Sequence, residues 1–280
     1  MTTSTTTPVV IVGVDTSAQS LAAARFGLDA ARCTRSALVL AHAWSVLDSG
    51  GRSHAAELRT AEAEATKVVD DLVAGLDGPS GVEVSTHLQQ GHPAGVLIGL
   101  SSTATLMVVG RHDWWLERLW DGRVSADVQR LAGCPVVAVP ERWRPETGWR
   151  GPVVVAADLD HSTTPVLTQA FATADSTGSE LVVVHATDAE ADETAAAADV
   201  DVLESHLAPF RDDTPSVVVR VVTAGESNGD AVRALVDCAS VVVVAVPRPE
   251  HRTGSMIARL LDDGGCPLVV VPSERPQHDR

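Results

Sequence analysis

The 280-residue chain contains two copies of one sequence pattern, and this duplication constrains its fold more than any other feature. An apolar run that ends in an aspartate opens each half: VVIVGVDTS at residues 9–17 and VVVAADLDHS at residues 153–162. Asp15 and Asp158 in these runs lie 143 residues apart. Each half closes on nearly the same phrase, GCPVVAVP and GCPLVVVP. Matching landmarks in the same order indicate a duplicated domain.

Further landmarks between these ends support the duplication. His42 and His185 follow equivalent apolar runs, again 143 residues apart, and residues 89–110 parallel residues 222–246. The matched position of the two histidines predicts a packing or turn role. The segment ERWRPETGWRG lies between the copies. It contains Pro145, Gly148 and Gly151 but no apolar run. We therefore predict a first domain at residues 1–140, a linker at 141–151 and a second domain at 152–280.

Within each half, short valine-rich runs alternate with segments of helical periodicity, which is typical of a parallel sheet covered by helices. Right-handed crossovers then favour an open five-stranded sheet of order 3-2-1-4-5. The predicted fold class is therefore α/β: two tandem Rossmann-like domains, each with helices on both faces of its sheet. In the first half the predicted strands are residues 9–14, 37–43, 82–88, 104–109 and 135–139, and the predicted helices are 17–33, 54–76, 93–102 and 124–131.

Charge and composition exclude several kinds of partner. The formal net charge is −16, and residues 152–280 hold 8 basic against 21 acidic residues, which argues against binding to nucleic acid or an anionic membrane. No apolar run reaches the length of a membrane span, and the start MTTSTTTPVV has no signal-peptide pattern. Four separated cysteines without a CxxC pair indicate a reduced, cytoplasmic protein. Cys134 and Cys266 are predicted to be small buried hydrophobes.

The predicted strand order locates a candidate ligand site. In such sheets ligands bind at the carboxyl ends of the strands where the winding reverses, here the first and fourth strands. Asp15 ends the first strand, Gly110 ends the fourth, and Gly122 and Ser125 begin the following helix, where N–H groups attract phosphate. A nucleotide site is one interpretation. In the other, Asp15 only satisfies N–H groups at a helix start, and the glycines only serve turns and caps.

Four segments resemble the universal stress protein family: IVGVDTSAQSLAAARFGLDAA, LVLAHAW, QGHPAGVLIGLSSTATLMVVG and LAGCPVVAVP. The resemblance covers nearly the whole chain, twice over, and points to a tandem member of the type common in actinobacteria. It implies a stress-response regulatory protein. In the ATP-binding branch of the family, the loop after the fourth strand reads G-x2-G-x9-G-[S/T].

By this resemblance, Asp15 and the backbone around Ala43 would hold the adenosine of ATP. The residues that would hold phosphates and ribose are Gly110, Gly122, Val124 and Ser125. The loop departs from the family pattern, because Asp113 stands at the second glycine position and Arg123 follows Gly122. A carboxylate beside a triphosphate implies a Mg²⁺ ion bound with the ATP.

The second copy departs further from the same pattern. Asp158 matches the first aspartate, and Gly254 and Ser255 match the end of the loop, but alanine and valine replace the first glycine and the loop is short. The resemblance therefore implies an adenine nucleotide in the first domain and a degenerate loop in the second.

The alternative is a member that binds no nucleotide and acts by docking to another protein. Trp114, Trp115 and Trp120 crowd the loop of the first copy, and residues 188–213 form an acidic helical stretch. Such a cluster marks an interface, and the acidic stretch is either a solvated helix face or a docking face for a basic regulatory partner. By resemblance, the last strands of the two copies pair within the chain as a pseudo-dimer, and two chains associate further as a homodimer. No residue is identifiable as a general base, so the activity implied is at most slow ATP hydrolysis.

Overall fold

The computed structural model describes residues 7–45, 54–76, 78, 81–111, 133–144, 149–160, 163–186, 193–224, 229–246 and 265–272. Contacts divide the chain into two compact units. The described part of unit 1 lies within residues 7–144, and that of unit 2 lies within residues 149–272. Among the described residues, no helix is long and apolar enough to cross a membrane.

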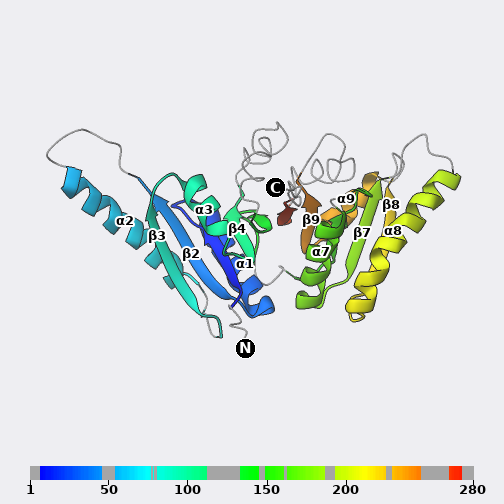
Figure 1. Cartoon of the computed structure of the whole chain (residues 1–280). Coiled ribbons are helices and arrows are strands. Elements are labelled where there is room, and N and C mark those ends of the chain that lie inside the picture. The colour runs from blue at the N-terminus through cyan, green and yellow to red at the C-terminus, as the bar shows by residue number, and fades with distance from the viewer. Residues whose placement is uncertain are drawn as a thin grey trace, which may run out of the picture. The chain divides into compact units, whose positions relative to one another are not determined.

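The described elements of unit 1 alternate strand and helix from β1 to β4, and β5 follows (Figure 1). Its elements are β1 (Val9–Gly13), α1 (Ala18–Thr34), β2 (Ala37–Trp44), α2 (His54–Ala74), β3 (Val84–Gln90), α3 (Pro93–Ser101), β4 (Leu106–Gly110) and β5 (Val136–Val139). Pro93 opens α3 at a position where a missing N–H costs nothing, and Arg35, with a left-handed backbone (φ 53°), ends α1.

Unit 2 repeats this succession. Its elements are β6 (Val153–Ala156), α7 (Thr163–Thr177), β7 (Leu181–Ala186), α8 (Glu193–Asp213), β8 (Val219–Ala224), α9 (Gly229–Cys238), β9 (Val241–Ala245) and β10 (Leu268–Val271). β6, β9 and β10 are buried along their whole length. The repeated order of elements is the structural form of the sequence duplication.

The strand order in unit 1 is β3-β2-β1-β4-β5, and in unit 2 the equivalent strands follow the order β8-β7-β6-β9-β10. All strand pairs described within the units are parallel. The predicted fold class and the predicted order 3-2-1-4-5 are therefore confirmed. The winding reverses between β1 and β4, and between β6 and β9, so each unit has a switch point between these strands.

Helices cover both faces of the sheet in unit 1. A Cβ atom on Gly27 of α1 would lie 2.4 Å from a methyl carbon of Val12, while a Cβ on Gly13 would lie 3.0 Å from Leu97 of α3. Successive residues of β1 thus face opposite helices. This explains why β1 is apolar throughout rather than alternating.

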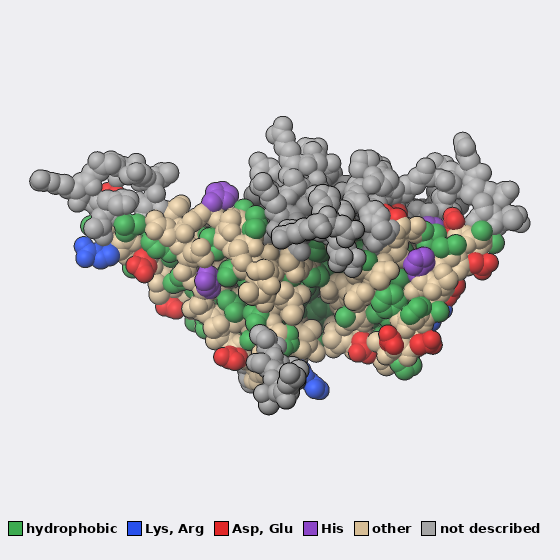
Figure 2. Space-filling model, viewed as in Figure 1, with side chains coloured by type: hydrophobic (Ala, Val, Ile, Leu, Met, Phe, Trp, Pro, Cys, Tyr) green, Lys and Arg blue, Asp and Glu red, His purple; other side chains and the backbone are tan. Residues whose placement is uncertain are grey.

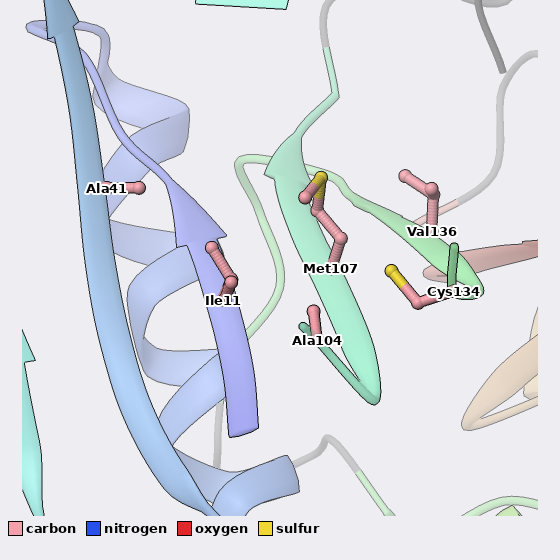
Figure 3. Close-up of a cluster of buried hydrophobic side chains, with 6 residues drawn as sticks. All are labelled: Ile11, Ala41, Ala104, Met107, Cys134 and Val136. Carbon is pink, nitrogen blue, oxygen red and sulfur yellow. The ribbon is translucent and has the colours of Figure 1, made fainter. Parts of the chain in front are cut away.

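A buried cluster fills the space between the sheet and α3 in unit 1 (Figure 3). Its buried members are Ile11, Ala41, Ala104, Met107, Cys134 and Val136, and Leu97 and Leu100 of α3 pack against it. In Figure 3, α1 lies behind the strands. The predicted burial of Cys134 and Cys266 is confirmed.

The predicted bounds agree with the structure to within about two residues in the described elements. The largest difference is β3, which begins and ends two residues later than predicted, at Val84–Gln90. β3 is also half-exposed rather than buried on both faces, because it is the last strand of its sheet and carries the polar sequence VSTHLQQ. The predicted helix at residues 124–131 lies outside the described residues.

The first residues of the predicted linker still pack against unit 1. Trp143, only 4% exposed, meets Phe26 of α1 edge to face, with 5.2 Å between the ring centroids. Residues 141–144 therefore stay against unit 1 after β5 ends. The predicted boundaries at 140 and 152 remain a prediction.

The buried thiol of Cys134 gives a chemical test of this core. Burial raises the pKa of Cys134 from 9.0 to about 12, while a hydrogen bond with the backbone of Met107 acts in the opposite direction. At pH 8 the thiol is therefore protonated, and a thiol reagent such as Ellman's reagent is expected to label exposed Cys238 but not Cys134 until urea unfolds unit 1. Equal labelling rates for the two cysteines in the folded protein would contradict this packing.

The raised pKa of Cys134 also makes the stability of unit 1 depend on pH. The folded pKa lies above the unfolded value, so the stability that the buried neutral thiol contributes is complete below pH 9 and is lost as the pH rises towards 12.

Candidate functional site

Asp15 follows β1 at the switch point of unit 1 and organises the start of α1. Its Oδ1 accepts hydrogen bonds from the backbone N–H of Ser17 (2.9 Å), from the hydroxyl of Ser17 and from the hydroxyl of Ser20 (2.7 Å). The Asp15 N–H in turn contacts the Ser20 oxygen at 2.8 Å. The bond to Ser17 is an Asx turn, which replaces a backbone turn before the helix. Helix entry is therefore a role of Asp15 that the structure shows.

Ala43 lies on the neighbouring strand β2, two residues beyond Ala41, which pairs with the last residue of β1, Gly13. The carbonyl of Ala41 accepts from Val14 on the β1 side, whereas the carbonyl of Trp44 accepts from Gly91 on the β3 side. Since backbone groups of a strand alternate in direction, the N–H and C=O of Ala43 both point to the side of β1, past its last pairing at Gly13. A donor and an acceptor are thus directed at the switch point.

Gly110 ends β4 and packs tightly under the first turn of α1. A Cβ atom at this position would lie 2.7 Å from the Cβ of Gln19 and 3.2 Å from its carbonyl carbon. Gln19 also donates a hydrogen bond to Glu141, at 3.1 Å, after β5. The need for glycine at position 110 therefore follows from helix packing, without any ligand.

His42 and His185 make the same contact in the two units. Nδ1 of His42 lies 2.7 Å from the carbonyl oxygen of Val14, and Nδ1 of His185 lies 2.8 Å from that of Ala157. Because a carbonyl can only accept, each ring donates from Nδ1 and so fixes the backbone at the end of β1 or β6. Both histidines thus have a structural role at a strand end, as the predicted packing or turn role implied.

The switch point of unit 2 differs in its chemistry. Asp158 occupies the place of Asp15, but Asp160 replaces Ser17, and its N–H bonds to the Thr163 hydroxyl at 3.0 Å. Ala245 and Val246 replace Gly110 and Arg111, and both are buried, whereas Gly110 and Arg111 are half-exposed. Unit 2 thus has an additional carboxylate at its helix entry and a more enclosed strand end.

The structure brings together part of the predicted site. Asp15, Ala43 and Gly110 lie at the carboxyl ends of adjacent strands in unit 1, and Asp158 lies at the equivalent place in unit 2. The remaining predicted site residues, Gly122, Val124, Ser125, Gly254 and Ser255, lie outside the described residues, as do Trp114, Trp115 and Trp120. Ser20 and Gln19 are contacts that sequence reasoning missed, although their position in the first turn after Asp15 was a usable signal.

Acidic side chains lie along the α8 side of unit 2 in Figure 2. Described carboxylates on this helix include Asp199, Asp201 and Asp212, and Glu204 pairs with Arg211. Among the described residues, no group of three histidine, cysteine or acidic side chains is arranged to hold a metal ion.

The fold and this geometry define a class: a doubly wound α/β fold, repeated twice in the chain, with polar groups of Asp15 and Ala43 at the switch point of the first copy. The sequence model described as the universal stress protein family matches residues 7–140. Residues 7–140 therefore form a domain of the universal stress protein family.

Relatives match the full length of the chain as well. Universal stress proteins MT2087 and Rv2028c of Mycobacterium tuberculosis are each 28% identical over 275 residues, covering 94% of this chain and 96% of theirs. A universal stress protein of Archaeoglobus fulgidus superposes with a TM-score of 0.69 at 16% identity, over 95% of this chain and 96% of its own. The cytoplasmic domain of a prokaryotic cation chloride cotransporter superposes with a TM-score of 0.53 at 12% identity, over 96% of this chain and 97% of its own. These likenesses show the fold, which is shared by proteins of different kinds.

Gly110→Ala is expected to destabilise unit 1 by about 1–3 kcal/mol, because the added methyl group collides with Gln19. Gly99→Ala is the matched control: Gly99 is an exposed residue of α3 with open space around its Cβ position, so alanine there is expected to stabilise by about 0.5–1 kcal/mol. Urea denaturation of both variants measures the difference. A neutral Gly110→Ala would show that α1 does not press on β4.

Proposed function

We propose that unit 1 binds an adenine nucleotide, ATP, at the crevice between the carboxyl ends of β1 and β4, and that this binding serves a regulatory role in the stress response. One observation carries the proposal: the N–H and C=O of Ala43 both point to the side of β1 beyond its end. Because β2 continues to Trp44, past the residue paired with the end of β1, this donor and acceptor are directed at the place where ligands bind in this fold.

The Ala43 backbone suits adenine in particular. Adenine presents a ring-nitrogen acceptor beside an amino donor, so one backbone N–H and one C=O on the same side can read both groups. On the equivalent edge, guanine presents two neighbouring acceptors, and the carbonyl of Ala43 would then face an oxygen. The proposed site therefore favours adenine over guanine.

Asp15 is placed to receive the ribose. Its carboxylate is exposed, and Ser17 and Ser20 hold it in one position, so ribose hydroxyls can donate to it without reordering the side chain. In this proposal the phosphates extend towards the end of β4 and the segment that contains Gly122, Val124 and Ser125. A Mg²⁺ ion would offset the repulsion between Asp113 and the phosphates.

Unit 2 is proposed to bind no nucleotide. Ala186 repeats the placement of Ala43, but Asp158 and Asp160 bring two carboxylates to the helix entry, where phosphate needs positive potential. Buried Ala245 and Val246 close the strand end that Gly110 and Arg111 leave accessible. The two copies would therefore divide between a ligand-binding unit and a unit without ligand.

Ala43→Pro tests the site directly. The Ala43 N–H points away from the β2–β3 ladder, so proline removes the proposed adenine donor while the ladder bonds of Trp44 remain. ATP affinity, measured by calorimetry, is expected to fall at least tenfold. The matched control, Ala186→Pro, makes the same change in unit 2 and is expected to leave ATP affinity unchanged.

Two further results complete this test. Denaturing the purified protein is expected to release adenine nucleotide, and ATP is expected to change the emission of half-buried Trp44, which adjoins Ala43. Wild-type protein that gives no heat and no released nucleotide at millimolar ATP would overturn the proposal and leave docking to a protein partner. Equal ATP binding by wild type and Ala43→Pro, with unchanged circular dichroism, would place the ligand elsewhere.

A further inference from the structure

β3 is an edge strand with little protection. It pairs with β2 along seven residue pairs and ends the strand order of unit 1. Between Val84 and Gln90 there is no charged residue and no proline, although proteins commonly use both to blunt a sheet edge. In Figure 2 the surface over β3 is largely tan, the colour of uncharged polar side chains and backbone.

The hydrogen bonds of β3 fix which backbone groups face outward. The Glu83 carbonyl accepts from Leu38, and the Gly91 N–H donates to Trp44, so the odd-numbered residues of β3 point to β2. Because the direction alternates along a strand, the N–H and C=O of Val84, Thr86, Leu88 and Gln90 point away from the sheet. α2 packs mainly on β2 and less on β3.

The equivalent edge of unit 2 is different. β8 is one residue shorter, and it carries exposed Arg220, whose Nε bonds to Glu180 at 2.9 Å. A charged side chain on an edge strand disfavours the addition of another strand. The two copies of the fold thus differ at this edge: β8 is protected by a charged side chain, and β3 is not.

We propose that the β3 edge is an interaction surface for a second copy of this chain, which adds its own β3 antiparallel to the first. The two-fold axis passes through His87. In this register Val84 faces Gln90 of the copy and Thr86 faces Leu88 of the copy, so all four outward residues form hydrogen-bonded pairs, about eight bonds in total. His87 faces its own counterpart as the close, non-hydrogen-bonded pair.

Charge supports a copy of the chain as the occupant. In the two-fold register no charged residue of Val84–Gln90 meets a like charge, since the segment has none, and Glu83 falls opposite Gly91 of the copy. Like charges placed opposite each other would oppose pairing, and this register avoids them.

The association is expected to be weak and to respond to salt. One added strand pair buries less surface than a stable dimer interface needs, so dimers are expected only at high protein concentration. The described charged residues of α2, which comes near its counterpart in this arrangement, are mostly acidic (Glu57, Glu62, Glu64, Asp70 and Asp71, against Arg59 and Lys67). Salt screens such repulsion and is expected to strengthen the dimer.

Cysteine pairs test the register. Single cysteines are placed at His87 or at Gln89 in full-length protein whose Cys33 and Cys238 are changed to serine. His87→Cys brings the two Cα atoms to about 4.5 Å and is expected to form a covalent dimer under mild oxidation. Gln89→Cys places its two copies about 14 Å apart, too far for a disulfide, and is expected to remain monomeric. Equal cross-linking of the two variants would overturn the register.

Sedimentation velocity between 5 and 500 µM tests the surface itself. Wild-type protein is expected to shift towards dimer as concentration rises, while Thr86→Pro, which removes one outward N–H, is expected to stay monomeric. Val221→Pro makes the matched change at an outward position of β8 and is expected to dimerise like the wild type. The proposal fails if wild type stays monomeric at 500 µM, if Thr86→Pro dimerises normally, or if Val221→Pro also abolishes the dimer. Pairing with added extended peptides but not with itself would assign the edge to a different partner.

Discussion

The close packing of α1 against the sheet is the constraint on which the candidate site depends. Gly27 admits Val12 of β1 directly against the helix, and Gly110 admits the first turn of α1 over the end of β4. The helix therefore starts directly above the switch point, where the Asx turn of Asp15 leads into it. A helix start at this place directs N–H groups and polar side chains into the crevice where ligands of this fold bind. Loss of either close approach would move both the helix start and Asp15.

Much of the fold could be predicted from the sequence, because the periodicity of its apolar residues changes clearly between strands and helices. Apolar runs without alternation identify strands buried on both faces, and right-handed crossovers leave one natural order for them. β3 was the weakest case: its polar sequence follows from its place at the edge, and the pattern of VSTHLQQ alone does not show where pairing with β2 begins and ends. For the site, Asp15 and Gly110 were identifiable from the strand order. Ser20 had a local signal, its position five residues after Asp15, whereas the contact of Gln19 with Gly110 arises only when α1 packs. The packing of α1 on β4 explains the glycine at position 110, and the sequence around Gly110 does not reveal this packing.

The two copies show how one fold diverges after duplication. The parts that fix the backbone are retained: the strand order, the histidine at the second strand and its bond to the end of the first. The parts that would meet a ligand have changed, from Ser17 to Asp160 and from Gly110 to Ala245. The edges have changed as well, since β8 carries an ion pair and β3 does not. A division of roles between the copies requires that the fold is retained while the site residues change.

In the proposed function the copies have divided these roles, so that a chain with two equivalent folds has one competent nucleotide site. The number of nucleotides bound per chain measures this most directly, and native mass spectrometry of the intact protein titrated with ATP and Mg²⁺ gives that number. Saturation is expected at one ATP per chain. Saturation at two per chain, or no bound ATP at millimolar concentration, would contradict it.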